Sequence, residues 1–385
     1  MTSLILPTVG GKTERYSLSG TPVSAPEKAG GRNRIAYAAA HVVADPFADN
    51  DPWLSPAIDW DRTIAYRQHL WGLGFGVAEA MDTAQRGGGL HWADSLDLIR
   101  HALEAAGPDD KIASGCGTDH LDPADAKSLD DVIAAYETQI DAIEKLGGNL
   151  ILMASRALTK VAKGPEDYAK VYDRLLSQVR EPVMIHWLGD MFDPALKGYW
   201  GSENLDTAMD TCLGILQTNA AKVEGIKISL LDDQKEVKMR RMLPDGVSMY
   251  TGDDFNYPAL IKGDDQGYSH ALLGIFDVIA PVAAAALDHL AAGDIAEYDH
   301  LFAPTVPLSR HIFKAPTNFY KTGVVFMAYL NGHQDHFTMI GGQESARSTQ
   351  HLAELFRLAD KAGLFADPDM AAARCASVMS VRGIA

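Results

Sequence analysis

The chain has 385 residues, 47% of them hydrophobic, and a formal net charge of −17 at pH 7. This length allows one large domain or two ordinary ones with a sizeable core. So acidic a chain argues against nucleic acid and an anionic membrane surface as partners, because both would repel it.

The cysteines fit a reducing compartment, and the hydrophobic runs match neither a signal peptide nor a membrane span. The three cysteines, Cys116, Cys212 and Cys375, are far apart and match neither a disulfide framework nor a zinc-finger spacing. The first residues lack the basic segment and apolar core of a signal peptide, and no run reaches the roughly 18 apolar residues of a membrane span. We therefore expect a cytoplasmic protein with no membrane partner.

Taken in order, the chain begins with residues 1–33, which are rich in Gly, Ser and Pro and predict an N-terminal arm or hairpin. Beyond them, apolar stretches alternate with segments of helical spacing. Strands are predicted at residues 34–43, 74–81, 111–114, 149–155, 182–188, 223–230, 247–250 and 267–273. Helices are predicted at residues 59–73, 90–106, 128–146, 165–179, 205–218, 233–242, 257–261 and 280–292, with Asp59 as the cap of the first.

This alternation over residues 34–294 predicts an α/β fold, a closed (β/α)8 TIM barrel of parallel strands. A doubly wound open sheet is the alternative, but no GxGxxG turn follows the first strand. The alternation then stops, and residues 295–385 predict a C-terminal helical extension packed on the barrel.

Polar side chains gather where the predicted strands end, which is where a barrel of this kind holds its active site. They are His41, Glu79, Asp82, Thr83, Thr118, Asp119, His120, Ser155, Arg156, His186, Lys227, Tyr250, Asp253, Asp254, Ser269 and His270. Any one of them alone is compatible with a structural role. Together they predict a polar pocket for a small molecule.

Lys227 interrupts the apolar sixth strand, Val223-Glu224-Gly225-Ile226-Lys227-Ile228-Ser229-Leu230. A buried strand normally excludes ammonium groups, because removing a charge from water costs several kcal/mol. One explanation is a lysine at a strand end that reaches solvent. The other is chemical: burial lowers the pKa of a lysine, and the neutral amine attacks a carbonyl to form a Schiff base.

Three motifs resemble the dihydrodipicolinate synthase / N-acetylneuraminate lyase family of class I aldolases, over about residues 34–365. Gly225-Ile226-Lys227 is similar to the family's Schiff-base lysine motif, and Thr251-Gly252-Asp253-Asp254 to its Ser-Gly-Asp-Asp signature. The segment from Gly263 to Ser269 resembles its glycine-rich entry to the eighth strand, and Gly115-Cys116-Gly117-Thr118 resembles its third strand end. The chain looks like a divergent, poorly characterised branch of that family.

Two departures concern the substrate and the proton relay. Where the family binds a 2-oxo-acid carboxylate with a Gly-Thr-Thr-Gly-Glu turn, this chain has Asp82-Thr83-Ala84-Gln85. An aspartate there would repel a carboxylate and would accept hydrogen bonds from hydroxyl groups. The family's fourth-strand tyrosine is replaced by Ala154-Ser155-Arg156-Ala157. His186 is the first candidate for the missing relay, and Arg156 is a candidate to bind a carboxylate or polarise an oxygen.

The resemblance implies a Schiff-base lyase, aldolase or dehydratase that acts on an unphosphorylated, hydroxylated keto compound, either a keto acid or a sugar-derived molecule. Lys227, His186 and Arg156 are the expected catalytic residues. The expected substrate-binding residues are Asp82, Thr83, Thr118, Asp119, His120, Tyr250, Asp253, Asp254, His270 and His41. The resemblance implies no cofactor, a small-molecule carbonyl substrate as the ligand, and a homodimer or homotetramer.

Two other functions stay open at this level. Histidines and carboxylates at a barrel mouth are typical of metal-dependent hydrolases and isomerases, and His41, His120, His186 and His270 are then the expected ligands. No His-x-His spacing supports this alternative. The remaining possibility is a barrel that binds a sugar-like ligand without turnover.

Overall fold

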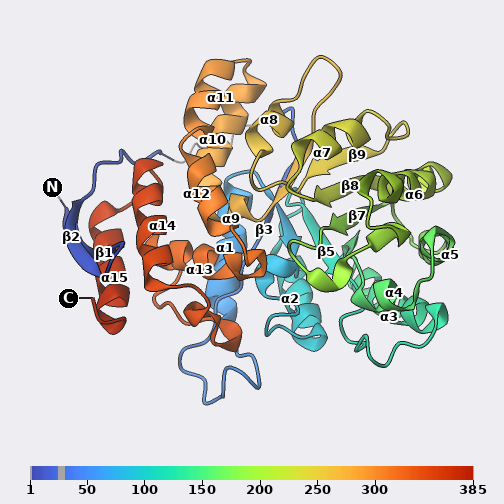
Figure 1. Ribbon diagram of the computed structural model, residues 1–385, viewed down its shortest axis with the longest axis horizontal. Helices are drawn as coiled ribbons and strands as arrows, with labels where there is room; N and C mark the ends of the chain where they lie inside the picture. The colour runs from blue at the N-terminus through green and yellow to red at the C-terminus, as the bar shows by residue number, and fades with distance from the viewer. Residues whose placement is uncertain (1, 25–30, 385) are drawn as a thin grey trace.

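A closed barrel of eight parallel strands forms the centre of the computed structural model, which describes residues 2–24 and 31–384. Around the barrel the strands follow the order β10-β3-β4-β5-β6-β7-β8-β9 (Figure 1). They are β3 (Ala36–Ala39), β4 (Gly76–Glu79), β5 (Ile112–Cys116), β6 (Asn149–Leu152), β7 (Val183–Leu188), β8 (Val223–Ser229), β9 (Ser248–Thr251) and β10 (His270–Leu273). The predicted TIM barrel is confirmed, and the open-sheet alternative is wrong.

Helices connect the strands on the outside of the barrel. They are α1 (Trp60–Gly72), α2 (Trp92–Ala105), α3 (Leu129–Lys145), α4 (Arg156–Val161), α5 (Pro165–Leu176), α6 (Leu205–Thr218), α7 (Asp233–Arg240), α8 (Tyr257–Lys262), α9 (Ile275–Val278) and α10 (Ala280–Ala291). Short 3-10 turns lie at η1 (Asp82–Ala84), η2 (Pro194–Leu196), η3 (Tyr199–Gly201) and η4 (Ala220–Lys222). Asp59 caps α1 as predicted, because its side chain accepts the N–H of Arg62 at 3.0 Å.

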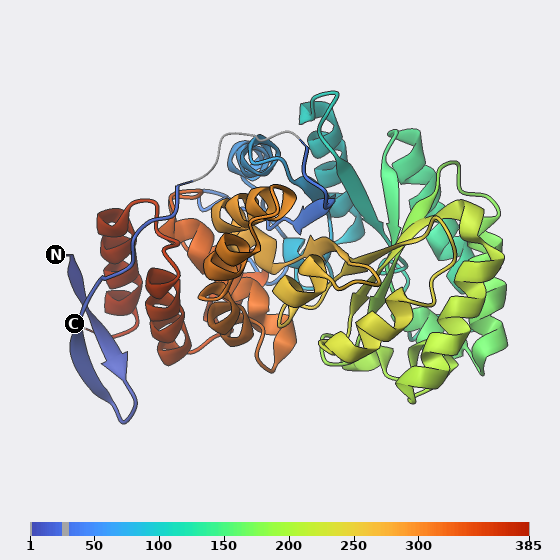
Figure 2. The ribbon, with the colours of Figure 1, turned by 90° about the horizontal axis from the view of Figure 1, so that it is seen from above.

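The C-terminal part of the chain is helical, as predicted, and packs on one side of the barrel (Figures 1 and 2). It contains α11 (Ile295–Phe302), α12 (Thr305–Ile312), η5 (Thr317–Phe319), α13 (Tyr320–Leu330), η6 (Ile340–Ser345), α14 (Thr349–Lys361) and α15 (Pro368–Val381). The described N-terminal residues form a hairpin, β1 (Ser3–Thr8) and β2 (Lys12–Ser17), and residues 25–30 of the predicted arm lie outside the described residues.

The hairpin is fixed to the far end of these helices through α14. The buried carboxylate of Asp360 accepts the hydroxyl of Tyr16 at 2.7 Å and the N–H of Ser19 at 2.9 Å. Arg357 donates to the carbonyl of Pro7 at 2.9 Å. The hairpin and α15 therefore lie at the end of the molecule most distant from α4, α5 and α6 (Figures 1 and 2).

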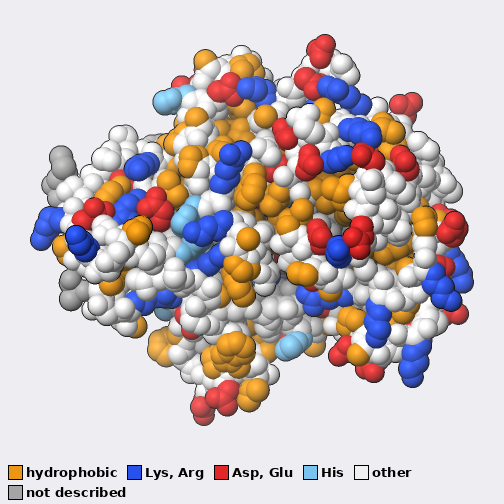
Figure 3. Space-filling view, viewed as in Figure 1, with side chains coloured by type: hydrophobic (Ala, Val, Ile, Leu, Met, Phe, Trp, Pro, Cys, Tyr) orange, Lys and Arg blue, Asp and Glu red, His pale blue; other side chains and the backbone are white. Residues whose placement is uncertain are grey.

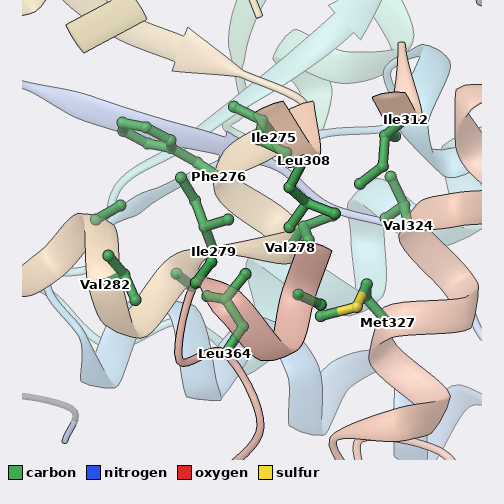
Figure 4. Packing of buried hydrophobic residues seen from close by; sticks show 14 of the residues in the cluster. Ile275, Phe276, Val278, Ile279, Val282, Leu308, Ile312, Val324, Met327 and Leu364 are labelled. Carbon is green, nitrogen blue, oxygen red and sulfur yellow. The ribbon is translucent and has the colours of Figure 1, made fainter. Parts of the chain in front are cut away.

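One continuous apolar core joins the barrel to the C-terminal helices. Ile275 of α9 and Ile279, which lies between α9 and α10, share this core with Leu308 of α12 and Val324 of α13 (Figure 4). Helix α13 lies so deep between these elements that all 11 of its residues are buried. Burial on this scale is the main driving force that holds such helices in place. The start of α13 is consequently fixed against the barrel mouth.

The outer surface mixes both signs of charge, as Figure 3 shows for one face. The exception is the long connection between β3 and α1, which projects from the lower edge in Figures 1 and 3. Its side chains Phe47, Trp53 and Leu54 are largely exposed. Within the described residues, no helix is long and apolar enough to cross a membrane.

A buried carboxyl group, Glu236 of α7, ties the outer layer to the barrel. It accepts the hydroxyl of Thr251 at 2.9 Å and that of Ser269 at 2.7 Å. Burial raises the pKa of Glu236 to about 8, although the two hydroxyls oppose this effect. The folded protein therefore keeps a proton on Glu236 over a range in which the unfolded chain, with a glutamate pKa of about 4.3, has lost it.

We predict that Glu236→Gln makes stability less dependent on pH. The native state binds the extra proton between about pH 4 and pH 8, so the stability that this carboxyl contributes falls as the pH rises through that window. The amide of the variant does not titrate, so this decrease in stability with rising pH disappears. Thermal unfolding measured from pH 5 to pH 9 should show a smaller decrease in Tm for the variant. The exposed Glu104→Gln is the control, and equal slopes in all three proteins would contradict the prediction.

Candidate active site

Lys227 lies on the inner wall of the barrel, close to its C-terminal mouth. Successive side chains of β8 alternate between the two faces of the strand, and Ile226 and Ile228 pack outward against the surrounding helices. Lys227 between them therefore points inward, and it is only 7% exposed. The solvent-reaching alternative for this lysine is wrong.

Two glycines of the quoted motifs make room for this arrangement. A Cβ atom on Gly252 would lie 2.7 Å from Cε of Lys227 and 2.2 Å from Oγ of Ser229. A Cβ atom on Gly225 would lie 2.7 Å from the ring of Tyr250. Heavy atoms cannot approach so closely, so both positions require glycine. Gly252 therefore leaves the space that the Lys227 side chain occupies, and Gly225 leaves the space for the ring of Tyr250.

Two carboxylates surround the amine of Lys227 without forming an ion pair with it. Burial lowers the pKa of Lys227, while the charges of Asp254 and Asp82 oppose that shift. Burial raises the pKa of Asp254 to about 7, against the opposing effects of the N–H of Ile275 and of Lys227. Asp254 can thus hold or release a proton near neutral pH, which is the property required of the acid–base partner of an amine nucleophile.

His186 on the neighbouring strand β7 is the direct cross-strand partner of Lys227. Its Nε2 lies 3.1 Å from Oγ of Ser229, and its Nδ1 is buried without a hydrogen-bond partner in the described part of the chain. Burial first, and the charge of Lys227 second, lower the pKa of His186 well below its usual range. The imidazole is therefore neutral, and it can accept or pass on a proton but does not store positive charge.

The structure adds a tyrosine that the sequence patterns did not reveal. The hydroxyl of Tyr320, at the start of α13, lies 2.9 Å from Oγ1 of Thr83. Burial raises the pKa of Tyr320 well above its usual range, and the charges of Asp82 and Asp254 add to this effect. The same two carboxylates act on Lys227, so the phenol belongs to the same group of side chains. No strand-end pattern could indicate Tyr320, because it comes from the C-terminal helices.

A cavity of about 130 Å³ opens at the barrel mouth, and several predicted site residues line it, although Lys227 and Asp254 are not among them. They are Asp82, Thr118, Asp119, Arg156 and His186. The hydroxyls of Thr118 and Ser155 are 2.6 Å apart.

Ion pairs hold the charged groups of this cavity in place. Arg156 binds Asp193, and Arg86 binds Asp119 with Nη2 2.6 Å from Oδ1. An adjoining cavity shares Asp82 and Arg156 and is also lined by Tyr320 and Lys321.

Two predicted site residues lie at the wrong end of the barrel. His270 is the first residue of β10, not the last, and its Nδ1 accepts the N–H of Ile35 at 3.0 Å. Tyr250 points toward the same end, where its hydroxyl donates to Glu224 at 2.7 Å. The strand predicted at residues 267–273 begins only at His270 in the structure. His270 therefore lies at the start of that strand and not at its end.

Three more predicted residues serve the surrounding framework. His41 points to the outside of the barrel, with Nδ1 2.8 Å from Oδ2 of Asp277. His120 contacts Gln139 through Nδ1 at 2.8 Å. Asp253 accepts the N–H of Phe255 at 2.8 Å and so closes its own turn. Alternation of residue types locates strand ends well, but it does not determine which way a side chain turns after the strand.

The predicted metal ligands do not converge. His41 lies outside the barrel wall, His270 at the opposite end, and His120 beside α3. Across residues 2–24 and 31–384, no three His, Cys, Asp or Glu side chains come together in an arrangement that could hold a metal ion. The ligand set of the metal-dependent alternative is therefore wrong. Glu79 is also structural, because it binds the buried Arg67 with Oε1 2.8 Å from Nη2.

The barrel with its added C-terminal helices is the fold of the dihydrodipicolinate synthase structures. The enzyme from Aquifex aeolicus is 12% identical, with a TM-score of 0.64 over 86% of this chain and 98% of that one. The enzyme from Oceanobacillus iheyensis is 16% identical, with a TM-score of 0.59 over 85% and 96%. A prophage protein of the dihydrodipicolinic acid synthase family from E. coli K12, solved in complex with pyruvate, is 15% identical, with a TM-score of 0.66 over 86% and 99%.

Residues 4–384 match a family model described as a protein of unknown function, DUF993. The chain belongs to that family, and it shares its fold with the dihydrodipicolinate synthase structures. No curated protein matches the sequence.

We predict that Gly252→Ala displaces the amine of Lys227. The added methyl group overlaps Cε of Lys227 and the hydroxyl of Ser229, so the amine must leave its position. Labelling of Lys227 by a small aldehyde and cyanoborohydride, read by peptide mass spectrometry, should fall by about tenfold or more. Gly214→Ala in α6, where a Cβ atom meets nothing within 4 Å, is the matched control. Normal labelling of the Gly252 variant would contradict the assigned geometry.

Proposed function

We propose that this protein is a lysine-dependent lyase of the class I aldolase type. Its substrate is an unphosphorylated, hydroxylated keto compound, either a keto acid or a sugar-derived molecule. The observation that carries the proposal is the amine of Lys227, buried on the inner barrel wall beside Asp254, a carboxyl group with a pKa of about 7. The shared fold with the dihydrodipicolinate synthases supports it.

In the proposed reaction, neutral Lys227 attacks the substrate carbonyl carbon, and loss of water gives a protonated imine. The positive nitrogen then withdraws electrons from a neighbouring bond. In a cleavage, a base removes the proton of a β-hydroxyl group, the carbon–carbon bond breaks, and its electron pair forms an enamine while an aldehyde leaves. In a dehydration, a base removes an α-proton and the β-hydroxyl group leaves as water. After a cleavage, the enamine first takes a proton at carbon and so becomes a protonated imine again. Hydrolysis of the imine then returns Lys227 in both cases.

The surrounding side chains have separate roles in this scheme. Asp254 exchanges a proton with Lys227 and with the carbinolamine, because its pKa of about 7 allows both states. His186 and the Thr83–Tyr320 pair are the groups that relay protons to the substrate. Arg156, half-exposed at the cavity edge and paired with Asp193, orients a substrate oxygen. Asp82 accepts hydrogen bonds from substrate hydroxyl groups.

The proposal keeps the cytoplasmic setting and the homodimer or homotetramer that the sequence resemblance implies. Light scattering of the purified protein tests the assembly, and a monomer would contradict it. Thr118 and Asp119 stay proposed substrate contacts, because both line the cavity that also contains Asp82 and His186.

We predict that borohydride traps a covalent adduct on Lys227 when the protein is mixed with carbonyl compounds such as pyruvate or dihydroxyacetone. Reduction of the imine fixes the substrate carbons to Nζ, and peptide mass spectrometry identifies the site. Lys227→Ala should lose the adduct and lower turnover by at least about a thousandfold. The exposed Lys145→Ala is the matched control. Undiminished turnover in Lys227→Ala would end the proposal.

We predict that Asp254→Asn changes both the rate and the pH profile of imine formation. The carboxyl group donates a proton below about pH 7 and accepts one above it, so the wild-type profile should contain a limb with a pKa near 7. The amide removes this limb and slows the step by roughly a hundredfold or more. Asp265→Asn, at an exposed turn position, is the control. A limb near pH 7 that persists in Asp254→Asn would assign the titration to another group.

A further inference from the structure

Asp82 is a carboxylate at the barrel mouth whose acceptor positions are unused. Both cavities of the mouth include it, and they share three other charged residues, Arg86, Arg156 and Asp193. Arg156 pairs with Asp193, and Arg86 pairs with Asp119. Across residues 2–24 and 31–384, no donor hydrogen-bonds to the half-buried carboxylate of Asp82, and no cation forms an ion pair with it. An ionised carboxylate can only accept hydrogen bonds, so this one is free to accept them from a ligand in either cavity.

The charge of Asp82 acts on both lysines of the mouth. Burial lowers the pKa values of Lys227 and Lys321, and Asp82 is among the carboxylates that oppose each shift. The ammonium group of Lys321 lies 5.6 Å from the centre of the Tyr320 ring, and Lys321 lines the same cavity as Asp82. The ring face and the carboxylate both attract this cation. The protein itself therefore supplies the counter-charge of Lys321, which does not require an anionic ligand.

The charges of the four groups close to the reaction cancel without any charge from the substrate. Before the reaction, Lys227 is neutral, Asp254 holds the proton that its pKa of about 7 allows, and Asp82 and Lys321 are opposite in sign. When the imine forms, the proton of Asp254 leaves in the released water, so Asp254 becomes negative and the imine nitrogen positive. The sum is zero in both states. A substrate carboxylate would add a negative charge that none of these four groups balances, and a neutral Lys321 would make that excess larger.

We propose that Asp82 determines specificity: it is the counter-ion of the protonated imine on Lys227 and accepts a hydrogen bond from a substrate hydroxyl group. The substrate is then an uncharged, hydroxylated aldehyde or ketone of the sugar type. This inference rests on the proposed Schiff-base function and selects the sugar-derived molecule over the keto acid. It follows from the place of Asp82 at the start of η1, directly after the C-terminal end of β4, between the amine of Lys227 and both cavities.

The first arm of the test measures binding without imine chemistry. Erythritol and erythronate differ in one terminal group, a hydroxymethyl or a carboxylate. At millimolar concentration and equal ionic strength, erythritol should raise the Tm of the wild type, of Lys227→Ala and of the exposed control Asp109→Asn, while erythronate should not. Asp82→Ala should lose the erythritol effect, and Asp82→Asn should gain an erythronate effect. The inference is overturned if erythritol gives no shift, if its shift survives in Asp82→Ala, or if erythronate protects the wild type equally.

The second arm links Asp82 to Lys227. Cyanoborohydride trapping is compared for dihydroxyacetone and hydroxypyruvate, which again exchange a hydroxymethyl group for a carboxylate. Asp82→Asn should lower the half-saturating concentration of hydroxypyruvate relative to that of dihydroxyacetone by about tenfold compared with the wild type. Because this ratio compares two proteins, the different reactivity of the two carbonyl groups cancels.

An unchanged ratio in Asp82→Asn would overturn the inference, while adducts on Lys227 would still uphold the proposed function. Erythritol binding that depends on Asp82, without a Lys227 adduct from either compound, would uphold the neutral ligand and end the proposed function.

Discussion

The arrangement at the barrel mouth depends on one constraint: the amine of Lys227 is kept from water and is given no salt-bridge partner. Burial favours its neutral form, while Asp254 and Asp82 lie close enough to influence its pKa but not to fix its proton. Gly252 is what permits this, since any larger residue would displace the methylene next to the amine. A close ion pair would have held the Lys227 amine in its charged form. The buried Arg67 is held in this way by Glu79.

The C-terminal helices complete the mouth as well as covering the barrel. Helix α13 is apolar along most of its length, and its burial between α9, α12 and α14 fixes its first turn. That turn carries Tyr320, whose hydroxyl pairs with Thr83, and Lys321, which lines the adjoining cavity. The ring of Tyr320 stacks on Phe313 with centroids 4.4 Å apart, which limits its motion. Packing far from the chemistry thus sets the position of two polar groups beside it.

Much of the fold and part of the site could be predicted from the sequence. The eight strands and their helices follow from periodicity, and Lys227 stood out because an ammonium group interrupts a run of Val and Ile. Asp82, Thr83, His186 and Asp254 do lie around that lysine in the structure. His41, Tyr250, Asp253 and His270 do not, because their side chains turn to partners in the framework or lie at the opposite barrel end.

The sequence alone determined the order of the elements, the closed barrel and the strand that carries the lysine, since these depend on local patterns of apolar and polar residues. Only the tertiary structure decided which polar groups share a cavity. Tyr320 and Thr83 are 237 positions apart, and no local pattern relates a residue at a helix start to a turn so distant. The physical reason is that burial, and with it each pKa, depends on contacts between segments that the chain brings together only when it folds.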